Sequence, residues 1–311
     1  MGLKKTNRHL LLNDLKQNRS LWAMLIPAAI FFIAFNYIPM GGVILAFKDF
    51  NYVDGILRSP MVGFENFKFL LLSGKLWNIT WNTIRYNIVF SAVGLVLQLS
   101  IAIFVTRVGG RLYKKFLQSV IFLPYFISFV ILGSFTYNIF NYEFGALNAF
   151  LTKLGLERLD VFGNPDCWLG IMTFFANWKW MGWGSVIYIA TITGFDPQIY
   201  EAAEVDGASI WQQIRKITLP MLKPTIIVIC LFDVSRILKG NFELFYNIIG
   251  DNATLFNATD VIDTYVFRSL TRNFNVGIGS AVGLYQSLFG LVLIVTVNWI
   301  VKKIDENSAL F

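Results

Sequence analysis

The chain has 311 residues, of which 56% are hydrophobic and 14% are charged, with a formal net charge of +7. An ordinary soluble domain has roughly 25% charged residues, and the 30 phenylalanines and 9 tryptophans exceed what a water-soluble core of this length hides. Composition therefore excludes an ordinary soluble enzyme. His9 is the only histidine, which excludes His-based metal sites and Ser-His-Asp chemistry. The chain has no Walker phosphate loop, so we do not expect it to hydrolyse ATP itself.

Six apolar segments follow one another along the chain. A transmembrane helix needs about 20 apolar residues, and the segments 21–47, 86–106, 116–142 and 273–301 meet this length without any Asp, Glu, Lys or Arg. Two further segments are interrupted by charge: 167–195 contains Lys179, and the segment after Pro224 contains Asp233, Arg236 and Lys239. The sequence therefore predicts an all-α polytopic membrane protein with six transmembrane helices.

The predicted domain organisation is an N-terminal tail (1–20), one membrane domain (21–303) and a C-terminal tail (304–311). Both tails and the short loops on their side carry 14 basic residues, against 8 in the longer loops on the opposite side. Lys and Arg concentrate in cytoplasmic loops, so we expect both termini in the cytoplasm. Because the basic excess follows topology, we expect the lipid bilayer and no nucleic acid as a partner.

The predicted cytoplasmic loop 196–223 contains signals for two short helices. Asp196 followed by Pro197 is typical of a helix start, and Asp206-Gly207 can end that helix. A second helix is expected over 209–216, with Leu219-Pro220 as its end. Glu201 presents a carboxylate beside two small residues, which suits close docking of a partner. An interfacial amphipathic helix without a partner is the alternative.

The spacing of this loop resembles a known motif. Glu201-Ala202-Ala203, Gly207, Ile217, Leu219 and Pro220 fill the pattern EAA, three residues, G, nine residues, I, any residue, L, P. This pattern resembles the EAA loop of permease subunits of bacterial ABC importers. Softer motifs resemble the maltose-transporter-like sugar permeases, and more narrowly the branch for complex oligosaccharides and polysaccharides: IPMGGVILAFKDFN (38–51), GFENF (63–67), WNT (81–83), FLPYFISFVI (122–131) and WKWMGWGSVIYIA (178–190). Lys239 stands where similar permeases usually carry a small residue.

The resemblance implies a multi-pass protein of the bacterial cytoplasmic (inner) membrane that forms half of a translocation pathway for an oligosaccharide. It implies four kinds of partner: a second permease subunit, a dimer of ATP-binding subunits that holds ATP and Mg, an extracellular substrate-binding (lipo)protein and the sugar. Glu201 is expected to contact a basic residue of the ATPase, and Gly207 to allow the bend. The implied coupling residues are Glu201, Ala202, Ala203, Asp206, Gly207, Ile217, Leu219 and Pro220. The resemblance implies no catalytic residue, no metal site and no cofactor in this chain itself.

Aromatic and amide side chains in the interrupted helices are candidates for the substrate path, because aromatic rings stack on sugars and polar groups bond hydroxyls. The candidates in these helices are Asn177, Trp178, Trp183, Tyr188, Asn241, Phe242, Glu243 and Tyr246. Tyr285 and Gln286, on the uncharged last span, are further candidates, although a polar pair there can also bond a neighbouring helix. Among them, Asn241, Phe242, Glu243 and Tyr246 are favoured because Gly240 precedes them and can break the helix.

Other interpretations remain open at this point. Tryptophans also gather at membrane interfaces, and Asp233 and Arg236 are spaced to neutralise each other on one helix face. The cargo could be another small solute, such as an amino acid or a polyol. A secondary transporter would show inverted repeats, which are not visible. A membrane enzyme acting on lipid-linked sugar would need clustered carboxylates, whereas the acidic residues here are scattered.

Overall fold

The computed structural model describes residues 17–304, which form helices and loops and no strand beyond an isolated antiparallel bridge between Lys48 and Met61. Residues 1–16 of the predicted N-terminal tail, with His9, and residues 305–311 of the C-terminal tail lie outside this part. The α-helices are α2 (Arg19–Phe32), α3 (Ile38–Met40), α4 (Gly55–Arg58), α5 (Glu65–Leu72), α6 (Lys75–Arg107), α7 (Arg111–Phe122), α8 (Phe129–Phe140), α9 (Ala146–Lys153), α10 (Trp168–Thr193), α11 (Pro197–Val205), α12 (Ile210–Gln213), α13 (Leu219–Ser235), α14 (Phe242–Ile249), α15 (Phe256–Thr259), α16 (Ile262–Thr271) and α17 (Val276–Ile304). Short 3-10 helices are η2 (Gly41–Phe47), η3 (Leu123–Phe126), η4 (Pro165–Cys167) and η6 (Ala253–Leu255), and π-helices are η1 (Ile33–Tyr37) and η5 (Ile214–Thr218).

Four helical stretches of the described chain are long and apolar enough to cross a membrane: Arg19–Phe47, Lys75–Arg107, Ile210–Ser235 and Val276–Lys303. A fifth exists if Arg111–Phe126 and Phe129–Phe140, which meet at an 88° bend, are counted as one span. The structure thus confirms an all-helical chain with several apolar spans. The predicted count of six depends on α10, whose 26 residues include Lys179, and stays a prediction.

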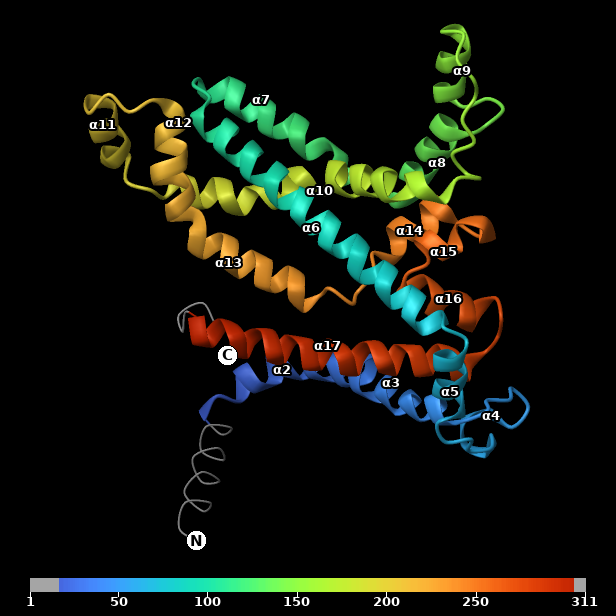
Figure 1. Cartoon of the computed structure of the whole chain (residues 1–311). Helices are drawn as coiled ribbons and strands as arrows, with labels where there is room; N and C mark the ends of the chain where they lie inside the picture. The colour runs from blue at the N-terminus through green and yellow to red at the C-terminus, as the bar shows by residue number, and fades with distance from the viewer. Residues whose placement is uncertain (1–16, 305–311) are drawn as a thin grey trace.

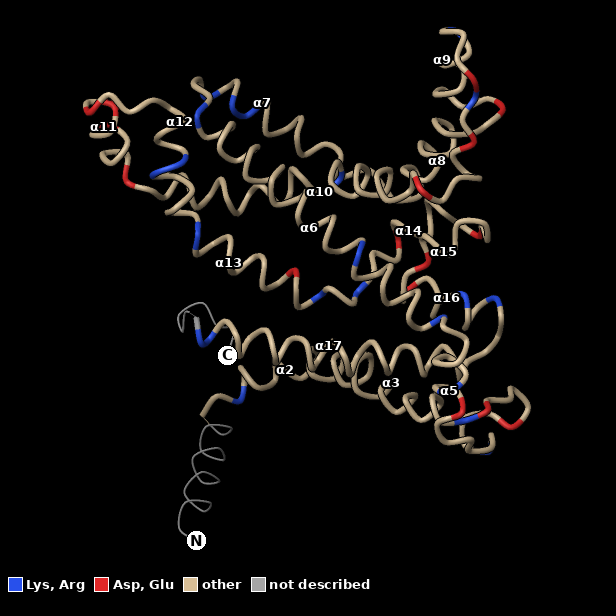
Figure 2. The backbone as a smooth tube through the Cα atoms, viewed as in Figure 1, with Lys and Arg blue, Asp and Glu red and all other residues tan. Residues whose placement is uncertain are grey.

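The long helices run between two ends of the molecule (Figure 1). α11 and α12 lie at one end, together with the start of α2 and the end of α17, whereas α4, α5, α9 and α14 to α16 lie at the other. Charged residues gather near both ends and are sparse along the helices between them (Figure 2). This is the distribution expected when the middle of the bundle lies in hydrocarbon, where an unpaired charge is costly.

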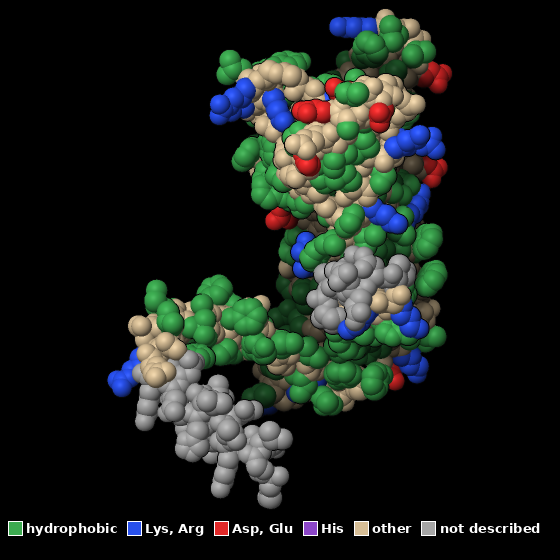
Figure 3. Space-filling model, turned by 90° about the vertical axis from the view of Figure 1, so that its left-hand side faces the viewer, with side chains coloured by type: hydrophobic (Ala, Val, Ile, Leu, Met, Phe, Trp, Pro, Cys, Tyr) green, Lys and Arg blue, Asp and Glu red, His purple; other side chains and the backbone are tan. Residues whose placement is uncertain are grey.

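α2 stands apart from the rest of the bundle. None of its 14 residues is buried, and the end-on view shows a mostly hydrophobic arm that projects from the body (Figure 3). Contact with the bundle is made further along the same span, where Ala46 of η2 is buried in a cluster with Ala281 and Val282 of α17. The exposed apolar surface of α2 is therefore available to lipid or to another membrane subunit.

α6 and α10 form the centre of the bundle, and α14 packs onto them. Tyr86 of α6 contacts Phe245 of α14 edge to face, with 4.8 Å between the ring centroids, and both rings belong to the largest buried cluster. α8 covers α14 closely at Gly133, where an added Cβ would lie 2.2 Å from the carbonyl oxygen of Asn247. Only glycine permits this separation between the two backbones.

The predicted single helix over 116–142 is in fact broken. α7 and η3 end at Phe126, Ser128 caps the start of α8 by accepting a hydrogen bond from the Ile131 N–H, and the chain bends by 88° between them. Pro124 lies in η3 and removes a backbone donor at this place. The prediction of one continuous helix was therefore wrong, because apolar length alone does not show a bend.

The second helix of the 196–223 loop also differs from the prediction. Leu219-Pro220 does not end it, because α12, η5 and α13 form one continuous helix over Ile210–Ser235. A proline ring collides with the carbonyl four residues earlier in a regular α-helix. Here the preceding π-turn, in which the Leu219 N–H bonds the Ile214 carbonyl, widens the backbone before Pro220. Pro39 follows the π-helix η1 in the same way.

Candidate functional site

The continuous helix that contains α13 ends at Ser235, and residues 236–241 form a non-helical break before α14. Free carbonyl groups at a break need partners when water is excluded. Asn87 of α6 supplies two of these contacts, because its Nδ2 group donates to the carbonyl oxygens of Ile237 at 2.8 Å and of Lys239 at 3.1 Å. The break is thus held to α6 by a side chain distant in sequence.

Asp263 and Gln286 hold the break from the other side. Oδ2 of Asp263 accepts hydrogen bonds from the Gly240 N–H at 2.5 Å and from Nε2 of Gln286 at 3.1 Å. The same Nε2 group donates to the Leu238 carbonyl at 2.7 Å. Burial raises the pKa of Asp263 above its ordinary value, and the hydrogen bonds from Gly240 and Gln286 partly oppose this rise. Side chains from three helices therefore fix the backbone of residues 238–240.

A cavity of about 1120 Å³ opens at this break, between α6, α10, α13, α14 and α17. Its lining combines three kinds of group that suit a hydroxyl-rich ligand. The aromatic groups are Phe90, Trp180 and Phe242, the amides are Asn87, Asn241 and Gln286, and the charged groups are Asp233, Arg236, Lys239 and Glu243. This set offers faces for stacking together with donors and acceptors for hydrogen bonds.

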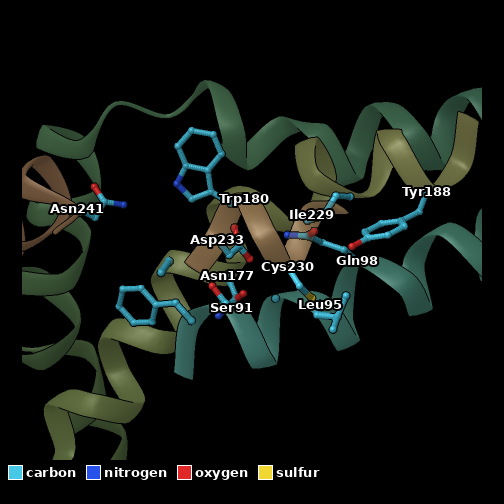
Figure 4. A pocket seen from close by; sticks show the side chains of 13 residues that line it. Ser91, Leu95, Gln98, Asn177, Trp180, Tyr188, Ile229, Cys230, Asp233 and Asn241 are labelled. Carbon is cyan, nitrogen blue, oxygen red and sulfur yellow. The ribbon is translucent and has the colours of Figure 1, made fainter. Parts of the chain in front are cut away.

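A smaller pocket of about 160 Å³ adjoins the cavity (Figure 4) and shares five lining residues with it: Phe90, Ser91, Trp180, Asp233 and Asn241. Its labelled side chains come from α6, α10 and α13, together with Asn241 at the start of α14, and include Gln98 and Tyr188. The Tyr188 hydroxyl is buried without a hydrogen-bond partner. A pocket of this size and polarity has room for water next to that hydroxyl. Polar surface therefore continues from the break into the bundle.

The cations of the cavity are not neutralised by close ion pairs. The ion pairs in the described chain are Lys68–Glu65, Lys75–Asp260, Arg268–Asp260 and Arg272–Asp251. Arg236 and Lys239 take part in none of them, so the mutual neutralisation of Asp233 and Arg236 considered from the sequence is not present as an ion pair. Both cations line the cavity, where Arg236 interacts electrostatically with Asp233 and Lys239 with Asp263 without a close ion pair.

The structure brings together some of the predicted path residues. Asn241, Phe242, Glu243 and Gln286 line the cavity, and Asn177 and Tyr188 line the adjoining pocket. Asn241 also caps α14 by accepting a hydrogen bond from the Leu244 N–H at 3.3 Å. Gln286 bonds the helix break, so its amide is largely committed to structure.

Four other predicted residues lie outside the cavity lining. Trp178 packs against the largest buried cluster, and Trp183 stacks on Tyr125 at 4.8 Å. Tyr246 lies between Phe242 and Phe267, with ring distances of 5.2 and 5.1 Å. The Tyr285 hydroxyl is 3.2 Å from that of Thr80. Their aromatic rings therefore contribute to packing between helices.

Sequence reasoning missed Asn87, Ser91, Trp180 and Asp263. Asn87 and Ser91 lie on a helix predicted only as an apolar span, and the only available signal was their polar character within it. Asp263 follows a short loop that carried no recognisable motif. Trp180 belongs to the quoted WKWMGWG stretch, in which the sequence favoured Trp178 and Trp183 instead.

The 196–223 loop forms a compact helical hairpin. Asp196 caps α11 by accepting a hydrogen bond from the Gln198 N–H at 3.0 Å, and Gly207 has a φ of +75°, which favours glycine. Ser209 and Gln212 form a capping box at the start of α12. The predicted helix starts and the bend at Gly207 are confirmed.

The hairpin presents an exposed surface that is both acidic and apolar. Glu201, Glu204 and Asp206 are exposed. Val205 is 88% exposed and Trp211 is 72% exposed, so two large apolar side chains lie on the surface of the same hairpin. Acidic side chains are visible on the end of the molecule that carries the hairpin (Figure 3). This surface has the character of a docking site for a protein with a basic and apolar groove.

Comparison with known proteins places this architecture in a family. Residues 98–306 match the model of the binding-protein-dependent transport system inner membrane component. The polygalacturonan/rhamnogalacturonan transport system permease protein YteP of Bacillus subtilis is 32% identical over 98% of this chain and 94% of its own length. The trehalose/maltose transport system permease protein MalF of Thermococcus litoralis is 27% identical over 90% of this chain and 92% of its own length.

A solved structure shows the same fold. A chain in the crystal structure of a bacterial alginate ABC transporter, in complex with an alginate pentasaccharide-bound periplasmic protein, is 31% identical. The match has a TM-score of 0.84 and covers 94% of this chain and 98% of the other. These findings confirm the importer permease that the EAA loop predicted. The chain belongs to the family of inner membrane components of binding-protein-dependent transport systems and is a permease subunit.

Proposed function

We propose that this permease forms one half of the translocation path for an acidic oligosaccharide. The observation that carries the proposal is the 1120 Å³ cavity at the helix break, which contains Arg236 and Lys239 outside any ion pair of the described chain. A carboxylate on a sugar ring can form a charge-assisted hydrogen bond to either group. The amides and aromatic rings around them suit the neutral parts of the same ring.

The names of similar proteins support this substrate class. Polygalacturonan, named for the Bacillus subtilis relative, consists of sugars that carry carboxylates. A second matching structure, 31% identical over 95% of this chain, is described as involved in the import of the acidic polysaccharide alginate. Asp233 and Glu243 line the same cavity and oppose a purely anionic ligand, but their oxygens can accept hydrogen bonds from sugar hydroxyls.

Transport also requires a connection to an ATPase, and we assign that role to the 196–223 hairpin. In this proposal the hairpin faces the cytoplasm and both termini lie on the same side. The bent pair α7–α8 counts as one span and α10 is also a span, which brings the number of spans in the 21–303 membrane domain to six. The exposed carboxylates Glu201, Glu204 and Asp206 complement a basic groove on an ATP-binding subunit. ATP and Mg bind that partner dimer, and a second permease completes the path. An extracellular binding protein delivers the sugar.

Substrate class is tested with the complete importer in proteoliposomes. Unmodified oligogalacturonides should stimulate ATP hydrolysis, and fully methyl-esterified ones, which lack the charge, should not. Lys239→Met should raise the KM for the charged sugar about tenfold, because loss of one charge-assisted hydrogen bond costs about 1.5 kcal/mol. Lys153→Met, on exposed α9, is the control. Equal stimulation by both sugars would contradict an acidic substrate.

Docking is tested by co-purification from detergent-solubilised membranes. Glu201→Lys reverses one charge of the hairpin and should reduce the amount of ATP-binding subunit recovered with the tagged chain. Glu157→Lys makes the same change at an exposed residue of the opposite end and should recover as much ATPase as the unmodified chain. Loss of ATPase with both variants, or with neither, would contradict docking at the hairpin.

A further inference from the structure

The last residue of α6 contacts the hairpin directly. Nη1 of Arg107 donates a hydrogen bond to Oε1 of Gln213 in α12 at 2.7 Å. The guanidinium carbon of Arg107 also lies 4.8 Å from the ring centroid of Tyr200 in α11. One side chain of α6 therefore contacts both helices of the hairpin, through a hydrogen bond on one side and a cation–π contact on the other.

The partners of Arg107 are themselves fixed. Gln213 is only 1% exposed, and its Nε2 group donates to the Ala208 carbonyl at 3.3 Å. The Tyr200 hydroxyl is 3.0 Å from that of Thr218, which is 2% exposed. Arg107 is absent from the ion pairs of the described chain. The contact thus joins the end of α6 to an ordered network of polar groups.

The opposite half of α6 reaches the cavity. Asn87 bonds the carbonyl groups of Ile237 and Lys239 at the helix break. Asn87 and Arg107 belong to one uninterrupted α-helix and lie about 30 Å apart along its axis, at 1.5 Å per residue. A single helix therefore contacts the hairpin near one end and the cavity backbone toward the other.

A second route joins the same two places through the chain itself, from α12 through η5 to α13. That route contains the π-turn at Ile214–Thr218, with Pro220 and Pro224 after it. π-turns and prolines are places where helices bend. α6 contains no proline and no π-turn over Lys75–Arg107, so it is stiffer than the connection through η5 and α13.

We propose that α6 carries motion of the hairpin to the cavity, and that Arg107 is the positioning residue that connects α6 to the hairpin. Movement of α11 and α12 with the ATPase then pulls or pushes the Asn87 end of α6 and shifts residues 237–239. The proposal rests on docking of the hairpin to an ATPase. It adds a specific mechanical connection that docking alone does not require.

The test uses the complete importer with Arg107→Ala, Gln213→Ala and the double variant. Arg111→Ala is the matched control, because Arg111 is an exposed arginine at the start of the next helix on the same end. The main readout is the ratio of ATP hydrolysis with and without binding protein loaded with oligogalacturonides. Arg107→Ala should lower this ratio at least about fivefold, the lower range of allosteric coupling. Arg107→Ala should also lower the kcat of ATP hydrolysis without changing the KM for loaded binding protein.

The double variant separates coupling from general destabilisation. If Gln213 acts through Arg107, the double variant should lose no more coupling than Arg107→Ala alone. The quantity of co-purified ATP-binding subunit is measured for every variant. Additive losses, loss of the ATPase from the Arg107→Ala complex, or an unchanged ratio in that complex would each overturn the inference.

A second readout does not depend on the sugar. Hydrogen exchange of residues 236–241 is compared between the nucleotide-free complex and the complex trapped with ATP and vanadate. Trapping should change exchange in the unmodified complex and in Arg111→Ala, and should leave it unchanged in Arg107→Ala. If oligogalacturonides fail to stimulate but exchange follows this pattern, the substrate class is wrong and the role of Arg107 stands. Equal changes in hydrogen exchange in all three complexes would overturn the role of Arg107.

Discussion

The ammonium group of Lys179 lies 2.9 Å from the carbonyl oxygen of Tyr125, where the chain bends between η3 and α8. The same group donates to the Ile127 carbonyl and lies 4.7 Å from the Phe129 ring centroid. Lys179 is only 5% exposed. Carbonyl groups freed by a bend need donors in a membrane, so this charge inside α10 supports the fold of its neighbour and does not line the cavity.

We therefore expect Lys179→Met to destabilise the protein. Methionine fills a similar volume but leaves two carbonyl groups without a donor, at a cost of about 1–3 kcal/mol each. The melting temperature of the purified complex in detergent should fall by about 5 °C or more. Lys115→Met, at an exposed position of α7, should change it little. Equal melting temperatures for the two variants would contradict the role of Lys179.

Close packing of α8 on α14 gives a second prediction. Gly133→Ala places a methyl group 2.2 Å from the Asn247 carbonyl oxygen and forces the helices apart. Overpacking of this kind costs about 1–3 kcal/mol. Gly170→Ala in α10 meets no atom within 4 Å and should stabilise slightly through helix propensity. Thermal unfolding of both variants checks the opposite signs, and a fall of equal size in both would contradict them.

Stability should depend on pH through Asp263. Burial raises the pKa of Asp263 in the folded state, whereas its pKa in the unfolded state is about 4. In the pH range between these two values, the folded state binds more protons than the unfolded state. Stability from this group is present at low pH and falls as pH rises through that window. Asp263→Asn keeps an acceptor for Gly240 and removes the titration. At each pH, the melting temperature of the unmodified protein is subtracted from that of the variant. This difference should be a few degrees more positive at pH 8 than at pH 4. A difference independent of pH would contradict this assignment.

Local signals predicted the parts of the fold that depend on a few neighbouring residues. Asp196 before Pro197 predicted the start of α11, and Gly207 predicted a bend that requires positive φ. The apolar segments predicted most of the long helices, although α6 begins at Lys75, 11 residues before the predicted start at 86. Residues 75–85 are too polar for hydropathy to include them, but they continue the same helix.

The cavity could be predicted only in part. Gly240 indicated the break, and three of the four residues favoured after it line the cavity, namely Asn241, Phe242 and Glu243, whereas Tyr246 does not. The contacts of Asn87 with Ile237 and of Asp263 with Gly240 join residues far apart in sequence. No local pattern specifies such pairs. The tryptophans of α10 show the same limit, because helix orientation decided that Trp180 lines the cavity while Trp178 packs in the bundle.

The π-turn before Pro220 also determines the angular phase of the helix that follows. An α-helix advances about 100° per residue, and the hydrogen bond from the Leu219 N–H to the Ile214 carbonyl encloses one residue more than an α-helical turn. Residues of α12 and α13 therefore cannot be drawn on one helical wheel, because the second set is rotated relative to the first. Deletion of one residue within 214–218 would rotate the hairpin surface around the axis of α13 and turn Trp211 toward a different side of the bundle.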